Sequence, residues 1–344
     1  MKVLVTGVEG YIGALLAPLL VDQGHEVIGL DTGYYREGWL YSDPGRANQP
    51  YTLNLDLRSA EAEQFEGVDA VVHLAELSND PLAENNVEIT HEINHLGSVR
   101  LAELAKQAGA TRFVYTSSCS VYGLGDGSFL TETDAVNPQT AYARCKLLVE
   151  RDVGAMADDD FSPVFLRNAT AFGASPRMRF DIVLNNLAGW AWTSKKIEMT
   201  SDGTPWRPLV HALDICRAVS CALLAPRDAI HNETFNVGQN SENYRVREIA
   251  EIIADTFPGC KLNIGSSAGD NRSYRVSFDK IHEGLAGFRC EWGAREGAQQ
   301  LRRIFERIDM PRETFEFRAF TRLKEIKYLL NTKQIDDRFF WTRL

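Results

Sequence analysis

The sequence predicts an α/β protein built on a doubly wound parallel (Rossmann) sheet. In the first third of the chain, five short apolar runs alternate with helical patterns, and each run is almost continuously hydrophobic. Runs of this kind are typical of parallel strands that helices cover on both faces. A glycine-rich turn follows the first run, at the position where such folds bind a phosphate group.

The predicted elements follow a regular order as far as about residue 173. Strands are predicted at residues 2–5, 25–31, 51–56, 69–75 and 112–118, with helices at 11–22 and 98–109. Alternation of strands and helices implies right-handed crossovers, which place the strands in one parallel sheet. Residues 1–172 are therefore predicted to form a nucleotide-binding domain, rejoined by part of residues 209–240.

The rest of the chain is less regular and predicts a smaller α/β lobe at residues 173–344, which would mainly bind substrate. Helical patterns occur at residues 181–194, 214–225 and 244–257, and a long C-terminal helix is predicted from about Glu313 to Leu330. Short elements around loops are typical of a region that carries binding residues on a more rigid scaffold.

The composition is that of a soluble globular protein and excludes several functional classes. The formal net charge is −10, so a broad basic surface for nucleic acid is not expected. The six cysteines form no CxxC pair and no cysteine–histidine cluster with zinc spacing, which predicts reduced thiols, no metal and a cytoplasmic location. No apolar stretch approaches the ~20 residues of a membrane span, and the first residues do not resemble a signal peptide.

The segment TGVEGYIG places glycines between the first predicted strand and the first predicted helix. Gly7 permits a tight turn, Gly10 lets backbone N–H groups approach a pyrophosphate, and Gly13 lets the helix pack closely on the strand. A loose glycine pattern can also be an ordinary turn. Here the strand, the loop, the helix and an acidic residue after the next strand agree, so the segment predicts dinucleotide binding.

The acidic residue is Asp31, at the end of the second predicted strand. A carboxylate at this position accepts hydrogen bonds from the adenosine ribose hydroxyls and repels a 2′-phosphate, which favours NAD over NADP. The alternative is an ordinary surface aspartate at a strand end. Arg36, five residues later, would weaken the preference for NAD if its guanidinium reached the same site.

A second group of polar residues follows the fifth predicted strand. That strand runs into VYTSSCSVYG, and the later segment YARCK places Tyr142 and Lys146 four residues apart, on one face of a helix. A serine, a tyrosine and a lysine that meet in the fold can transfer a proton, because a nearby positive charge lowers the tyrosine pKa from its usual ~10. The alternative is an ordinary tyrosine and lysine on an exposed helix.

In combination, the glycine loop, the serine-rich strand end and the Tyr-x-x-x-Lys motif resemble the extended short-chain dehydrogenase/reductase family. Within that family the chain resembles the NAD-dependent nucleotide-sugar epimerases and dehydratases, from Lys2 to about Lys280. The resemblance implies that Tyr142 is the catalytic acid/base, that Lys146 is its partner, and that Ser118 hydrogen-bonds the reacting sugar oxygen. It also implies contacts with NAD from the following residues: Gly7, Gly10, Tyr11, Ile12, Gly13, Asp31, Asp56, Leu57, Leu74, Ala75, Tyr142 and Lys146.

The resemblance further implies a nucleotide-sugar site. Arg207, in DGTPWRPLVH, would bind the diphosphate, because a guanidinium donates hydrogen bonds in a fixed fork. Thr170 and Ser267 depart from the family, which commonly has an asparagine and an arginine there, so the base and the sugar stay open. The substrate contacts that the resemblance implies are Glu76, Ser118, Thr170, Asn185, Arg207, Asp270 and Arg272.

The segment VVHLAE also departs from the family, where two alanines usually follow His-Leu. Glu76 takes the place of the second alanine and begins a loop that would border the sugar pocket. Its carboxylate would either recognise a hydroxyl or amine of the substrate or be a solvated loop acid. His73, at the strand end, is expected to line the cofactor cleft rather than to act as a catalyst.

The residues after Ser118 bear on the reaction. Sugar 4,6-dehydratases of the family usually carry Asp-Glu there, whereas this chain has Cys119 and Ser120, which would not readily protonate a leaving hydroxide. The leading interpretation is therefore an NAD-dependent nucleotide-sugar epimerase that acts at C4 through a transient 4-keto sugar. The alternatives are an NAD(P)H-dependent 4-keto-sugar reductase and a non-catalytic dinucleotide sensor. The resemblance also implies a homodimer, paired through helices at about 81–108 and 140–157.

Overall fold

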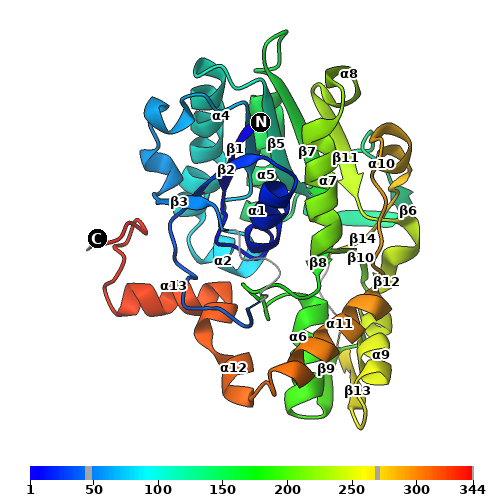
Figure 1. Cartoon of the computed structure of the whole chain (residues 1–344). Coiled ribbons are helices and arrows are strands. Elements are labelled where there is room, and N and C mark those ends of the chain that lie inside the picture. Colours follow the sequence, from blue (N-terminus) through cyan, green and yellow to red (C-terminus); the bar gives the residue numbers. More distant parts are fainter. Residues whose placement is uncertain (43–48, 268–271, 343–344) are drawn as a thin grey trace.

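The fold is organised around a seven-stranded sheet, in a computed structural model that describes residues 1–42, 49–267 and 272–342 (Figure 1). The strand order is β11-β7-β5-β4-β1-β2-β3, and all of the pairings are parallel. This is the strand order of a doubly wound sheet, which confirms the predicted fold class. The strands are β1 (Lys2–Thr6), β2 (Glu26–Asp31), β3 (Tyr51–Asn54), β4 (Ala70–His73), β5 (Arg112–Ser118), β7 (Ser162–Asn168) and β11 (Glu233–Val237).

Helices cover both faces of this sheet. Helices α1 (Gly13–Asp22) and α7 (Ala212–Leu224) pack together in one hydrophobic core, while α4 (Ser98–Gln107) and α5 (Ala141–Gly154) belong to a second core. The central strands are buried on both faces, which explains why their sequences are continuous apolar runs. Strand β11 joins the edge of the sheet from late in the sequence, but the predicted division of the chain into two domains stays a prediction.

Smaller sheets and a group of helices lie to the right of and below the main sheet in Figure 1. Three strands form one sheet: β8 (Thr170–Phe172), β10 (Trp206–His211) and β12 (Asn243–Arg245). Two parallel pairs are formed by β9 (Lys196–Ser201) with β13 (Lys261–Ser267), and by β6 (Leu124–Leu130) with β14 (Ser273–Val276). The helices α6 (Val183–Thr193), α9 (Val246–Thr256) and α11 (Ala294–Arg307) pack against one another beside them.

The prediction of one long C-terminal helix from Glu313 to Leu330 is wrong. The segment forms α12 (Arg312–Glu316), a short 3₁₀ turn η7 (Arg318–Phe320) and α13 (Arg322–Asn331). Phe317 and Thr321 adopt extended backbone conformations that interrupt the helix. Their neighbour Phe320 is buried against Phe180, so tertiary packing overrides the helical pattern of the sequence.

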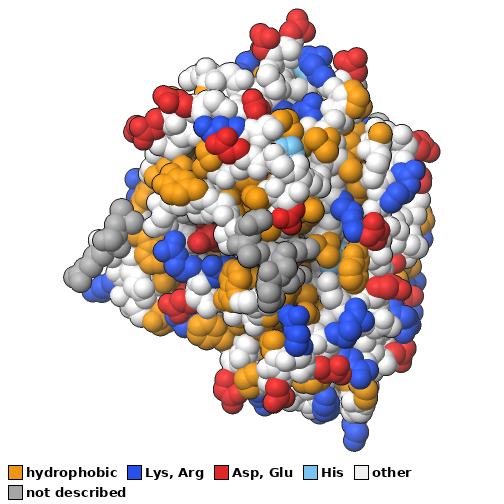
Figure 2. Space-filling view, in the orientation of Figure 1, with side chains coloured by type: hydrophobic (Ala, Val, Ile, Leu, Met, Phe, Trp, Pro, Cys, Tyr) orange, Lys and Arg blue, Asp and Glu red, His pale blue; other side chains and the backbone are white. Residues whose placement is uncertain are grey.

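The remaining elements are short and mostly connect the strands. They are η2 (Leu57–Ser59), η3 (Ala62–Phe65), α2 (Asp80–Asn85), α3 (Val87–Thr90), the π-helical η4 (His91–Gly97), η5 (Cys119–Tyr122), α8 (Arg227–Ile230), η6 (Asn240–Glu242) and α10 (Asp279–Gly284). Within the described residues, no helix is both long and apolar enough to cross a membrane. Acidic and basic side chains are interspersed over the face shown in Figure 2, so neither sign of charge dominates it.

Candidate active site

A cavity of about 450 Å³ lies at the carboxyl ends of the central strands. Open parallel sheets bind their ligands at this edge. The cavity is lined by residues that follow β1, β2, β4 and β5, by the first turns of α5, and by parts of β8, β10 and β14. Most of the residues that the sequence marked as chemically important line this cavity.

The glycine loop turns at the end of β1 as the sequence predicted. Gly7 has a φ of +72°, and a Cβ atom placed on it would lie 2.8 Å from the Ala75 backbone nitrogen. A Cβ atom on Gly13 would lie 2.2 Å from the Gly7 carbonyl oxygen. A side chain at either position would clash with the neighbouring backbone. Because both residues are glycines, the loop can turn tightly and leave room for a pyrophosphate beside the start of α1.

Asp31 lines the cavity at the end of β2. Its two carboxylate oxygens accept hydrogen bonds from the backbone N–H groups of Glu9, at 3.0 Å, and Gly33, at 2.7 Å. Burial raises the pKa of Asp31, and the Gly33 hydrogen bond opposes that rise. Arg36 does not line the cavity: it is half-exposed and contacts Asn54 and Glu9. The loop and this carboxylate together fit the diphosphate and the adenosine ribose of NAD.

The other predicted cofactor contacts also lie at the cavity. Asp56 caps the turn η2 by accepting a hydrogen bond from the Arg58 backbone N–H at 2.9 Å. Tyr11 donates its hydroxyl hydrogen to the Gly173 carbonyl at 2.6 Å, so its polar end is used within the protein. The structure places all of the following at the cavity wall: Gly7, Gly10, Tyr11, Ile12, Gly13, Asp56, Leu57, Leu74 and Ala75.

Helix α5 brings Tyr142 and Lys146 to the cavity one turn apart. Thr140 caps the start of the helix, and its hydroxyl accepts a hydrogen bond from the Ala143 backbone N–H at 3.2 Å. Lys146 Nζ lies 5.4 Å from the centroid of the Tyr142 ring and donates a hydrogen bond to the Thr116 carbonyl at 2.5 Å. The spacing of YARCK therefore gives the shared helix face that the sequence predicted.

Ser118 completes this group at the end of β5. It lines the cavity and is hydrogen-bonded to Tyr142. The preceding Ser117 is committed elsewhere, because its hydroxyl donates to Glu150 at 2.5 Å and Glu150 is paired with Arg167. The fold thus distinguishes two adjacent serines that the sequence alone presents as equivalent.

The electrostatic environment of Tyr142 differs from the sequence-based expectation. Burial raises the pKa of the Tyr142 hydroxyl above its usual value, and the carboxylates of Glu76 and Asp80 add to the rise. Arg179 and the hydrogen bond with Ser118 oppose it, but the net change is upward. The described structure therefore favours a protonated Tyr142.

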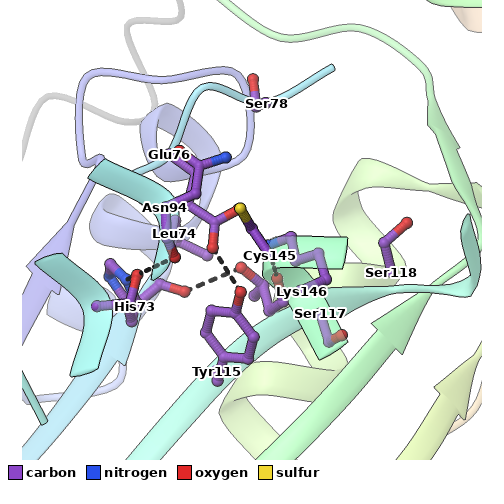
Figure 3. Close-up of polar contacts among 12 residues, drawn as sticks. His73, Leu74, Glu76, Ser78, Asn94, Tyr115, Ser117, Ser118, Cys145 and Lys146 are labelled. Carbon is purple, nitrogen blue, oxygen red and sulfur yellow. Dashed lines mark hydrogen bonds and ion pairs between the residues drawn. The ribbon is translucent and has the colours of Figure 1, made fainter. Parts of the chain in front are cut away.

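After burial, the Glu76 carboxylate contributes most to the rise in the Tyr142 pKa. Its Oε2 atom lies 2.7 Å from Lys146 Nζ, and its Oε1 atom accepts a hydrogen bond from the Tyr115 hydroxyl at 2.5 Å. Figure 3 shows the Glu76 side chain directed toward Tyr115 and Lys146. The glutamate side chain is 2% exposed, so the alternative of a solvated loop acid is wrong. A contact between Glu76 and substrate stays a prediction.

His73 is placed behind the cavity rather than on its wall, which corrects the expectation for this residue. Its Nδ1 atom lies 2.6 Å from the Thr6 hydroxyl and its Nε2 atom lies 2.7 Å from the Ser98 hydroxyl. Burial lowers the pKa of His73 to about 3, and Lys146 adds to the decrease, so the ring is neutral. The residue connects β1, β4 and α4 without facing a ligand.

On the predicted substrate side, Thr170, Arg207 and Arg272 line the cavity. Arg207 donates hydrogen bonds to the carbonyls of Trp206, at 2.8 Å, and Arg272. Arg272 forms an ion pair with Asp80 at the start of α2. Asp270 lies outside the described residues.

Asn185 is the clear exception among the predicted substrate contacts. It is fully buried in α6 and does not line the cavity. Its Oδ1 atom accepts from the Gly173 backbone N–H at 3.0 Å, and its Nδ2 atom donates to the Arg179 carbonyl at 3.1 Å. These bonds use the amide to hold the loop that follows β8, and a contact between Asn185 and substrate stays a prediction.

The cavity also has polar residues that the sequence did not single out. Arg179 and Asp181 form an ion pair at 2.8 Å on the loop before α6, and Arg322 reaches the cavity from α13. The loop residues lay in a stretch that carried no motif, and Arg322 has the pattern of an ordinary charged helix face. Further unpredicted polar residues at the wall are Asp80, Ser120 and Asn168.

The two residues after Ser118 are placed differently from each other. The Cys119 thiol is buried and contacts the Arg167 carbonyl at 3.1 Å, away from the cavity. Ser120 does line the cavity. Neither position supplies a carboxylate next to the serine, as the sequence indicated.

Comparisons with known proteins agree with this geometry. The family model "NAD dependent epimerase/dehydratase family" matches residues 3–238. A UDP-glucose 4-epimerase of Mycolicibacterium smegmatis is 31% identical over 279 residues, which cover 74% of this chain and 82% of that protein. A UDP-glucose 4-epimerase of Arabidopsis thaliana is 26% identical and covers 87% of this chain and 92% of its own length.

Two solved structures illustrate the structural similarity. The structure of MoeE5 in complex with UDP-glucuronic acid and NAD superposes with a TM-score of 0.77 at 28% identity, covering 90% of this chain and all of that one. A UDP-glucose 4-epimerase of Thermotoga maritima gives a TM-score of 0.78 at 21% identity, with 90% of this chain and 100% of that chain covered, which supports the fold.

Proposed function

The chain belongs to the NAD-dependent epimerase/dehydratase family and its cofactor is NAD, and on this premise we propose that it is a nucleotide-sugar epimerase acting at C4. One observation carries the proposal: the glycine loop, Asp31 and the group Ser118, Tyr142 and Lys146 meet in a single cavity. A proton-transfer group beside a dinucleotide site is what reversible oxidation of an alcohol requires.

In the proposed reaction, NAD⁺ held by the glycine loop and Asp31 would supply a reversible hydride acceptor for C4 of the sugar. Ser118 hydrogen-bonds the C4 oxygen, and the Tyr142 phenolate takes the proton of the C4 hydroxyl as the C4–H bond breaks. The resulting 4-keto sugar turns within the cavity. Tyr142 then gives the same proton back to the ketone oxygen as the hydride adds to the opposite face of C4. No net oxidation or reduction results.

The nucleotide would be held at the other side of the cavity. Arg207 and Arg272 line this region, and guanidinium groups suit a diphosphate because they donate in a fixed fork. UDP-sugars are the first substrates to test, because the relatives named above are UDP-glucose 4-epimerases. We also propose a homodimer, in which residues 81–108 pack against a second copy of the chain. The exposed side chains of Val87 and Leu96 on this segment fit that proposal.

A 4-keto-sugar reductase is the second candidate, and one observation favours it. A protonated Tyr142 is the form that donates a proton to a ketone, and burial together with Glu76 and Asp80 raises the pKa of this residue. The two activities differ in cofactor use. An epimerase recycles NAD in place, whereas a reductase consumes one NADH for each turnover.

The proposal is tested by incubating the purified enzyme with UDP-glucose, UDP-galactose and UDP-glucuronic acid without added cofactor. Released NAD(H) is quantified after denaturation, and the C4 epimers are resolved by chromatography. We expect near-stoichiometric NAD(H), formation of one C4 epimer, and loss of at least about 10²-fold of the activity in Tyr142→Phe. Turnover only with added NADH and a keto sugar would instead establish the reductase.

A further inference from the structure

The Glu76 carboxylate is part of the cavity, but its contacts are with the lysine of the proton-transfer group. Lys146 Nζ has two oxygen partners, Glu76 Oε2 at 2.7 Å and the Thr116 carbonyl at 2.5 Å. Tyr115 holds the second carboxylate oxygen at 2.5 Å, and its ring lies 4.6 Å below the ammonium. The lysine and glutamate side chains are only 4% and 2% exposed.

The backbone on either side of Glu76 is fixed. The Ala75 N–H donates to the Thr6 hydroxyl at 3.2 Å. The Asn94 side chain accepts from the Leu77 N–H at 2.8 Å and donates to the Leu77 carbonyl at 3.1 Å. Figure 3 shows Asn94 beside this segment. These hydrogen bonds fix the backbone of the loop, and the loop in turn positions the Glu76 carboxylate beside Lys146.

This arrangement changes the charge that faces Tyr142. A carboxylate at ion-pair distance offsets most of the ammonium charge at a short range, and the low local dielectric strengthens the effect. Tyr142 is faced by groups from every element packed around it: Glu76 after β4, Asp80 on α2, Ser118 at the end of β5, Lys146 on α5, and Arg179 before α6. The groups that face the pair itself are the neutral His73, the Tyr115 hydroxyl and the Cys145 thiol.

We propose that Glu76 is a positioning residue that acts through Lys146. Its carboxylate holds the ammonium against the Thr116 carbonyl and offsets the ammonium charge. Tyr142 therefore keeps its proton, and can act as a proton donor, up to a higher pH than it would beside an unpaired lysine. The inference rests on the proposed function for the role of Tyr142. The raised pKa of Tyr142 affects the oxidation of the C4 hydroxyl and the reduction of the 4-ketone in opposite ways. Proton removal from the C4 hydroxyl needs the phenolate and is slowed at neutral pH, whereas proton donation to the 4-ketone is favoured.

The test is a tyrosinate absorbance titration of the NAD-loaded protein. Subtracting the curve of Tyr142→Phe from that of the parent isolates Tyr142 among the 11 tyrosines. The same pair of curves is measured with Glu76→Gln, which keeps the shape and an acceptor for Lys146 but removes the charge. We expect the Tyr142 midpoint to fall by about one to two pH units. Glu251→Gln, at an exposed position on α9, is the matched control and should leave the midpoint unchanged.

Two results would overturn the inference. One is an unchanged or higher Tyr142 midpoint in Glu76→Gln. The other is a raised KM for the nucleotide sugar with no change in midpoint, which would make Glu76 a substrate contact. Glu76→Ala repeats the titration if the glutamine variant does not fold. Because the titration needs no sugar, failure to find an epimerase substrate would count against the proposed function and leave this test intact.

Discussion

Asp31 and Glu76 are two carboxylates at the same edge of the sheet, at the end of β2 and after β4 on either side of β1, and they are held in different ways. Asp31 accepts hydrogen bonds from two backbone N–H groups, of Glu9 and Gly33. Glu76 is held by two side chains, of Lys146 and Tyr115. Burial raises the pKa of both carboxyl groups.

The difference shows how the same functional group, a carboxylate, can have two roles in one cavity. Backbone donors cannot titrate, so they fix the geometry of Asp31 without coupling it to another proton. Lys146 and Tyr115 can titrate, so the charge of Glu76 is tied to the proton-transfer group. Asp31 is suited to recognition of a ribose, and Glu76 is suited to adjusting the pKa of the proton-transfer group.

The largest effect is expected from Lys146→Met, which leaves the Glu76 carboxylate buried without its cation. Removing one partner of a buried ion pair lowers the free energy of unfolding by about 3–5 kcal/mol. Loss of the ammonium beside Tyr142 should also lower turnover by about 10²–10⁴-fold. Urea unfolding at matched NAD content and the epimer assay measure the two effects.

The pH dependence of that stability loss has a defined sign. Without Lys146, the folded-state pKa of Glu76 rises further above its unfolded value, so the folded state binds the extra proton. Stability then falls as the pH rises through this range and returns on acidification. The double variant Lys146→Met/Glu76→Gln should regain most of the stability at neutral pH but no turnover. A single variant as stable as the parent at neutral pH would show that Glu76 does not depend on Lys146.

A smaller effect is expected from Asp31→Asn. The amide keeps one acceptor oxygen, so one of the two backbone N–H groups loses its partner and the adenosine ribose loses a charged acceptor. Hydrogen bonds to a charged group are worth about 1.5–3 kcal/mol, so NAD binding should weaken by about tenfold or more. NADP should be rejected less strongly. Calorimetric titration of both cofactors into cofactor-free enzyme measures this, with the exposed Asp22→Asn as control.

The two carboxylates also differ in how far the sequence could predict them. Asp31 follows an apolar strand and a glycine loop, and local spacing alone places it at the sheet edge. Tyr142 and Lys146 share a helix face for the same reason, because four residues make about one turn. The positions of these residues depend on contacts between residues that are close in sequence, and such contacts can be predicted from sequence patterns.

Glu76 and Asn185 show where sequence patterns stop. Glu76 meets Tyr115, on another strand, and Lys146, on a helix 70 residues later, so its partners depend on the tertiary fold. Asn185 belongs to a helix whose orientation turns the amide toward Gly173 instead of the cavity. Cys119 and Ser120 diverge for a similar reason, because the turn η5 sends adjacent side chains in different directions.

The smallest effect is expected from the C-terminal segment, which places a cation near Asp31 that no local sequence pattern predicts. Arg322 lines the cavity from α13, with its guanidinium 3.9 Å from the centroid of the Tyr35 ring. Burial lowers the pKa of Arg322 to about 10, and Arg179 adds to the decrease while Asp31 opposes it. The guanidinium still carries its charge at neutral pH and contributes to the field at the adenosine side.

We expect Arg322→Gln to raise the dissociation rate of NADH by roughly threefold to tenfold, which corresponds to about 1 kcal/mol of lost electrostatic support. Lys327→Gln, on the exposed face of the same helix, is the matched control. The rate is measured from the loss of NADH fluorescence after rapid dilution into excess NAD⁺. Equal rates in the two variants would mean that Arg322 packs against Tyr35 without influencing the cofactor. A faster rate in Arg322→Gln alone would show that cofactor binding at the Asp31 end also depends on a charged side chain from outside the sheet.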